Sequence, residues 1–179
     1  EADAAYVTST ERGTVLEKKG VKIQTCEHVL AALVGMNLDN VSIELDAPEP
    51  PIMDGSAKYF VEAIEKVGIV EQQAERNEYI VREVISYKNE ETGSEITVIP
   101  ADEYQVTTMV DFGTKILGTQ NAYMNTLSEF KDDIASARTF SFLHELEVLL
   151  DRGLIKGGDL NNAIIYVDKE PSAETMDKL

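Results

Sequence analysis

The chain has 179 residues, of which 43% are hydrophobic and 27% charged, a composition typical of a globular protein with a hydrophobic core. Its 33 acidic residues outnumber its 16 basic ones, and the net charge of −17 disfavours nucleic acid and anionic membranes as partners. The single cysteine, Cys26, excludes an intramolecular disulfide, which fits a reducing cytoplasm, and no apolar run approaches the roughly 20 residues that span a bilayer.

A strand, a helix and a second strand are predicted near the start of the chain. Residues 21–25 (VKIQT) alternate as a short strand does. Thr25 is a candidate N-cap for the next helix, which carries apolar residues at helical spacing and has a natural stop at Gly35. Residues 40–46 (NVSIELD) alternate again and predict a half-buried strand.

A proline-rich turn, a helix and a linker follow. Three prolines in residues 47–56 (APEPPIMDGS) forbid a helix there, and the Asp-Gly pair predicts a turn with a structural role. Ser56 is a candidate cap for a helix with one apolar face, which ends at Gly68. Residues 71–78 (EQQAERNE) lack apolar periodicity and predict a linker.

The second half predicts a β meander followed by helices and a last strand. Antiparallel strands and helices in layers define the fold class α+β, with a first domain at 1–70 and a second at 79–179. The meander and the later elements are expected at 79–87, 95–99 and 104–112 (strands), 129–137 (a helix capped by Ser128), 137–142 (extended), 144–152 (helix) and 163–168 (strand).

Two interpretations of the adjacent pair Glu27 and His28 stay open on the residues alone. A carboxylate in the first turn of a helix is stabilised by the positive end of the helix dipole, so the pair can be an ordinary helix start. Alternatively, His28 binds a metal ion and Glu27 acts as general base on a metal-bound water. Neighbouring helix positions point about 100° apart, so one residue can hold the metal while the other reaches the water.

Four motifs in order favour the second interpretation. They are TCEHVLAAL (25–33), PEPPIMDGSAKYF (48–60), SARTFSF (136–142) and RGLIKGGDLNNAIIYVD (152–168). Together they resemble the UDP-3-O-acyl-N-acetylglucosamine deacetylase family, zinc enzymes of lipid A biosynthesis. The resemblance implies a cytoplasmic hydrolase that acts on an acylated UDP-sugar. It also implies two similar domains, each of helices layered on a small sheet, and a βαβ insert at about 140–168 that surrounds the acyl chain.

The resemblance also implies roles for single residues. Glu27 would be the general base, His28 a zinc ligand, and Thr139 the hydroxyl that stabilises the oxyanion. Phe112 and Phe140 would pack against the sugar and nucleotide, although the residues alone favour ordinary core. The same alternative, core, stays open for the residues that would surround the acyl chain: Leu143, Leu146, Ile155, Gly158, Leu160, Ala163 and Ile165.

The match to the family is incomplete. The first strand region and the motif HKxxD, which carries the other zinc ligands, have no counterpart in the sequence, so the isolated chain is expected to be inactive and at risk of self-association. Cys26 is a weak candidate for a further ligand, and His144 is expected to be an exposed helix residue. Lys115 and Lys156 are candidate contacts for the anionic substrate. A non-catalytic α+β binding or scaffold domain is the alternative function.

Overall fold

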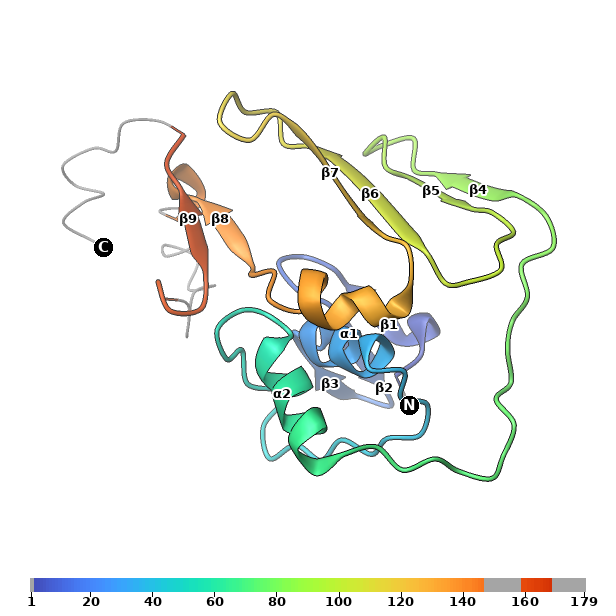
Figure 1. Ribbon diagram of the computed structural model, residues 1–179. Helices are drawn as coiled ribbons and strands as arrows, with labels where there is room; N and C mark the ends of the chain where they lie inside the picture. The colour runs from blue at the N-terminus through green and yellow to red at the C-terminus, as the bar shows by residue number, and fades with distance from the viewer. Residues whose placement is uncertain (1, 147–158, 169–179) are drawn as a thin grey trace.

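The computed structural model describes residues 2–146 and 159–168, and the statements below concern these residues (Figure 1). Small sheets, almost all of them antiparallel, combine with a few helices, which confirms the class α+β. The predicted positions of Ile155 and Gly158 in the acyl-chain surface, and the candidate contact Lys156, lie outside the described residues.

The first sheet has three antiparallel strands in the order β1–β2–β3. A 3-10 turn, η1, precedes it, and the bounds are η1 Ala4–Tyr6, β1 Val7–Ser9, β2 Val15–Lys18 and β3 Val21–Ile23. Lys19 and Gly20 both have positive φ angles, +52° and +81°, so they form the tight two-residue turn that suits a hairpin. The predicted strand at 21–25 is therefore present, but it ends two residues early.

Two helices follow the first sheet, α1 Glu27–Gly35 and α2 Lys58–Val67. The prediction of Thr25 as N-cap is wrong: its φ is +52°, and the N-cap position is occupied by Cys26, which makes no side-chain cap hydrogen bond. The N-cap position of α2 is Ala57, so the prediction of Ser56 as the cap is also wrong by one residue, although the hydroxyl of Ser56 accepts a hydrogen bond from the N–H of Lys58 at 3.1 Å.

The strand predicted at 40–46 is absent from the described structure. Its alternating apolar side chains, Val41, Ile43 and Leu45, are all exposed. A strand exists only where a neighbouring backbone pairs with it, and none of the described strands pairs with this segment. The alternation in the sequence was therefore real, but alternation alone does not provide a partner.

The predicted meander is instead two separate hairpins. One pairs β4 Ile85–Lys88 with β5 Glu95–Val98, and the other pairs β6 Val106–Asp111 with β7 Thr119–Met124. Strand β7 was not predicted because its residues, TQNAYM, are mostly polar and do not alternate in the apolar pattern of a half-buried strand.

The helix predicted at 129–137 begins earlier, with a 3-10 turn, η2 Leu127–Glu129, and continues as a π-helical turn, η3 Phe130–Ile134. Neither turn has a side-chain cap, so the prediction of Ser128 as cap is wrong. Figure 1 shows this segment lying against α1, and the packing is close: a Cβ placed on Gly35 would collide with the ring of Phe130. The core that results contains Ala32, Ala57, Val61, Met124, Phe130 and Ala135.

The last two strands, β8 Phe140–Phe142 and β9 Ile164–Tyr166, pair in parallel. Parallel neighbours need a crossover connection rather than a tight turn. Of the helix predicted at 144–152, residues 144–146 are described; they are helical, as is residue 143 before them.

Candidate active site

Glu27 and His28 lie in the first turn of α1, as predicted, and both are half-buried. The Glu27 carboxylate accepts a hydrogen bond through Oε2 from the backbone N–H of Thr14, at 2.9 Å. No hydrogen bond joins the His28 ring to any other described residue. The pair therefore combines a carboxylate held by a backbone N–H with an imidazole that has no hydrogen-bond partner among the described residues.

The thiol of Cys26 is not available in the same way. Cys26 is buried, and its Sγ donates to the carbonyl oxygen of Thr14 at 3.5 Å. Burial, together with the neighbouring carboxylate of Glu27, raises the pKa of the Cys26 thiol. Since metal ions bind the thiolate, this environment opposes the idea of Cys26 as a zinc ligand.

Thr139 lies just before β8, with its side chain exposed. Its backbone N–H donates to the carbonyl oxygen of Gly55 at 2.7 Å, and its own carbonyl oxygen accepts from the N–H of Ile164 at 3.0 Å. Its hydroxyl has no hydrogen-bond partner among the described residues. No hydrogen bond among the described residues joins Thr139 to Glu27 or His28.

Phe112 and Phe140, predicted as neighbours on one substrate surface, do lie together. Their ring centroids are 5.4 Å apart in an edge-to-face arrangement. Phe140 also contacts Phe142 at 6.0 Å and Tyr166 at 5.7 Å. These four rings, here called the aromatic cluster, combine the end of the β6–β7 hairpin with both strands of the β8–β9 sheet.

The residues expected around the acyl chain divide by exposure. Leu143 and Leu146 are buried, and Ala163 and Ile165 are half-buried. Leu160 is 75% exposed, so it presents an apolar side chain to solvent close to the start of β9.

His144 is exposed, as expected, but it has a partner. Its Nδ1 lies 2.8 Å from Oδ1 of Asp168, and its ring stacks on Phe142 with centroids 5.6 Å apart. The candidate contact Lys115 is an exposed residue between β6 and β7.

Residues 10–14 connect the Glu27 region with the helical turn after β8, a link that the sequence analysis missed. Arg12 forms an ion pair with Glu145, with Nη2 and Oε1 3.0 Å apart. The Arg12 guanidinium, helped by hydrogen bonds from the Phe142 N–H and the Ser141 hydroxyl, holds the pKa of the Glu145 carboxyl below its usual value. Two residues further on, the backbone of Thr14 binds Glu27.

Arg138 also went unrecognised, although it stands next to Thr139 in the ARTF motif. Its guanidinium donates to two backbone carbonyl oxygens, those of Asp54 and Leu160. The only signal in the sequence was this adjacency, because the two acceptors are 84 and 22 residues away.

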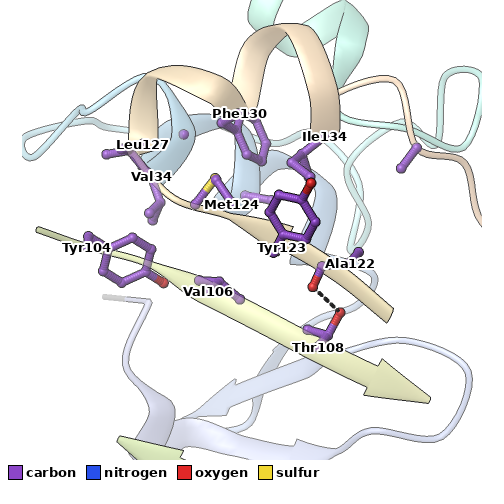
Figure 2. Close-up of a pocket in the computed structure, with 13 residues that line it drawn as sticks. Val34, Tyr104, Val106, Thr108, Ala122, Tyr123, Met124, Leu127, Phe130 and Ile134 are labelled. Carbon is purple, nitrogen blue, oxygen red and sulfur yellow. Dashed lines mark hydrogen bonds between the residues drawn. The ribbon is translucent and has the colours of Figure 1, made fainter. Parts of the chain in front are cut away.

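A separate apolar groove of about 360 Å³ lies between α1, the β6–β7 hairpin and the η2–η3 segment. Figure 2 shows Val34, Val106, Met124 and Phe130 pointing into it. None of the predicted site residues lines this groove, so it does not belong to the candidate active site.

The described residues do not complete a metal site. A zinc site needs about three protein ligands, and no group of three His, Cys, Asp or Glu side chains within residues 2–146 and 159–168 could hold a metal ion.

No helix in these two described stretches is both long and apolar enough to cross a membrane.

The fold and these contacts define an α+β protein with a carboxylate–imidazole pair and an aromatic cluster. Residues 1–177 match the family model for UDP-3-O-acyl N-acetylglycosamine deacetylase, and the chain belongs to this family. Proteins named bifunctional enzyme LpxC/FabZ from Bacteroides thetaiotaomicron and Porphyromonas gingivalis are 46% and 44% identical over 179 residues, which are 100% of this chain and 39% of each relative. The UDP-3-O-acyl-N-acetylglucosamine deacetylase of Myxococcus xanthus is 38% identical over 163 residues, 90% of this chain and 51% of that protein. The chain thus spans between 39% and 51% of the length of these relatives.

Proposed function

We propose that this chain is part of a longer cytoplasmic protein that removes the acetyl group from UDP-3-O-(hydroxyacyl)-N-acetylglucosamine, a step of lipid A biosynthesis. Membership of the deacetylase family supports the reaction class. The observation that carries the proposal for these residues is the start of α1, where a carboxylate held by a backbone N–H adjoins an imidazole that has no hydrogen-bond partner in residues 2–146 and 159–168.

The proposed role of Glu27 is that of general base. Because one carboxylate oxygen is held by the Thr14 N–H, the other keeps lone pairs that can accept a proton from an attacking water. The Thr139 hydroxyl is proposed to donate to the oxygen on which negative charge develops as the amide carbonyl is attacked. Its lack of a partner among the described residues suits that role.

The substrate is proposed to lie along the aromatic cluster and the β8–β9 region. Phe112 and Phe140 would contact the sugar and nucleotide. Leu143, Leu146, Leu160, Ala163 and Ile165, with Ile155 and Gly158, would form the acyl passage within a βαβ insert at about 140–168. The parallel pairing of β8 with β9 is what such an insert requires. The division into domains at 1–70 and 79–179 belongs to the same proposal.

Zinc is proposed as the cofactor, with His28 as the one ligand that the described residues contribute. These residues do not by themselves fit the ion, since the other ligands would have to come from elsewhere in the protein. The test is the zinc content of the complete protein: His28→Ala should lose most of its zinc, whereas His144→Ala, in which the other histidine is removed, should retain it. Equal zinc in both variants would rule out His28 as a ligand.

The activity is tested with Glu27→Gln in the complete protein. Loss of the base should lower kcat for acetate release by a factor on the order of 10² to 10⁴, with little change in KM. Glu62→Gln, on the exposed face of α2, is the matched control and should keep wild-type rates. If Glu27→Gln is as active as the wild type, Glu27 is an ordinary helix-start residue and the chain is better explained as a binding or scaffold domain.

A further inference from the structure

Three segments that are far apart in the sequence meet beside Thr139. They are here called the three-segment junction: residues 52–56, 137–140 and 159–164. The backbone of Thr139 lies in the middle, bonded to Gly55 on one side and to Ile164 on the other. The approach is close, because a Cβ placed on Gly55 would collide with the backbone oxygen of Asn162.

Arg138 holds the other two segments to its own. Its Nε donates to the carbonyl oxygen of Asp54 at 2.7 Å, and its Nη2 donates to the carbonyl oxygen of Leu160 at 3.3 Å. The planar guanidinium holds its N–H donors at fixed positions. Its two hydrogen bonds therefore fix the distance between the carbonyl oxygens of Asp54 and Leu160.

The turn that Arg138 binds has hydrogen bonds of its own. Oδ1 of Asp54 accepts hydrogen bonds from the Ser56 hydroxyl at 2.7 Å and from the Ser56 N–H at 3.1 Å. Ser56 is completely buried, and its hydroxyl also accepts from the N–H of Lys58. Arg138 therefore connects Thr139 to a turn that is hydrogen-bonded to the start of α2.

Residues 159–163, which Arg138 contacts through the carbonyl oxygen of Leu160, also have hydrogen bonds of their own. The side-chain oxygen of Asn162 accepts from the Asp159 N–H at 2.8 Å, and the Asp159 carbonyl oxygen accepts from the N–H groups of Asn162 and Ala163. Both acceptors of Arg138 thus belong to segments with their own internal hydrogen bonds, and both segments are also bonded to the backbone of Thr139.

We infer that Arg138 is a positioning residue for Thr139: it fixes the three-segment junction so that the Thr139 hydroxyl stays aimed at the reacting carbonyl. The inference rests on the role proposed above for Thr139. Both observed bonds of Arg138 go to backbone carbonyl oxygens, so its effect is on the geometry of the site rather than on substrate affinity. Displacing a catalytic donor by about 1 Å can cost on the order of 10² in rate.

The test is a double-mutant cycle on acetate release by the complete protein. Thr139→Ala should lower kcat by about 10². Arg138→Gln should lower kcat by about 10- to 100-fold while KM stays within about threefold. Because Arg138 acts through Thr139, the double variant should be within about threefold of Thr139→Ala alone.

Arg76→Gln is the matched control. Arg76 likewise joins segments distant in the sequence, bonding to Asp39 and to both the side chain and the backbone of Asn37, but it lies outside the junction. Its kcat should stay at the wild-type value. Arg138→Lys should recover part of the lost rate, since an ammonium group can still donate to one of the two carbonyl oxygens.

Each outcome separates the inference from the proposed function. Wild-type kcat in Thr139→Ala would refute the role of Thr139 itself. The inference about Arg138 alone would be overturned if Thr139→Ala loses most of its kcat but Arg138→Gln keeps the wild-type kcat. It would also be overturned if Arg138→Gln raises KM, or if its effect on kcat is fully additive with that of Thr139→Ala. If Arg138→Gln does not fold, hydrogen exchange of Arg138→Lys replaces it. The amides of residues 137–142 should exchange faster than in the wild type, while those of residues 37–40 should be unchanged. Unchanged exchange at residues 137–142 would also overturn the inference about Arg138.

Discussion

The three-segment junction and the β4–β5 hairpin are built in opposite ways. At the junction, side chains such as Ser56 and Asn162 are buried, and the bonds that Thr139 and Arg138 make to the other two segments join residues at least 22 positions apart in the sequence. The hairpin pairs only its own two strands, and its apolar face, formed by the cross-strand pairs Ile85 with Val98 and Tyr87 with Ile96, is exposed.

The hairpin is therefore ordered by local strand pairing, whereas the junction is ordered by contacts between segments distant in the sequence. The hairpin needs only a turn and two matching strands, and its register follows from local pairing. The junction needs three segments to arrive together, so its geometry is cooperative and any one wrong side chain disturbs all three. A catalytic hydroxyl gains from the second kind of order because its direction must be held within narrow limits.

The largest expected effect is that of Gly55→Ala. Gly55 has a φ of +81° and no room for a Cβ beside Asn162, so the free energy of unfolding of the complete protein should fall by roughly 2–4 kcal/mol. Gly20→Ala is the matched control, with the same φ of +81° but open space around it, and should cost only about 1–2 kcal/mol. Urea unfolding measures both; equal losses would mean that the junction can open to admit a methyl group.

Gly35→Ala should be next in size. Its φ is not in the left-handed region, so the cost comes from overpacking against the Phe130 ring, roughly 1–3 kcal/mol by urea unfolding. In the Phe130→Ala background the added methyl group should cost almost nothing. A cost that persists without the ring would show that α1 and the η2–η3 segment do not pack as described.

Substitution by threonine should affect the free energy of unfolding more in the core than on the β6–β7 hairpin. Val61→Thr places a hydroxyl in the core and should cost about 1–3 kcal/mol in the free energy of unfolding. Met109→Thr on β6, where the side chain is 76% exposed, should change it by less than about 0.5 kcal/mol. A loss above 1 kcal/mol for Met109→Thr in the complete protein would reveal that this face is covered there.

The smallest expected effect belongs to the ion pair of Arg12 and Glu145. Because the folded state lowers the pKa of Glu145, the pair stabilises the protein above the ordinary pKa of 4.5, and this contribution is lost as the pH falls through the lower, folded value. Both side chains are partly exposed, so the pair is worth less than about 1 kcal/mol. Thermal unfolding of wild type and Arg12→Gln should differ near neutral pH and converge in acid; a difference that is independent of pH would exclude the ion pair as its cause.

The sequence by itself determined the α+β class, the helices α1 and α2 and the family, because periodic apolar residues, glycine stops and contiguous motifs are local signals. It also placed Glu27 and His28 in the first turn of a helix. It did not determine strand pairing: residues 40–46 alternate without a partner, while the polar β7 pairs along its full length.

Only the tertiary structure decided what surrounds Thr139. Gly55 lies 84 residues before Thr139 along the chain, and the Arg138 guanidinium bonds to backbone carbonyl oxygens, which every residue type presents alike. No residue pattern marks such an acceptor, so the contact becomes visible only once the chain has folded. The same reason explains why the anchoring of Glu27 by the backbone of Thr14 could not be predicted.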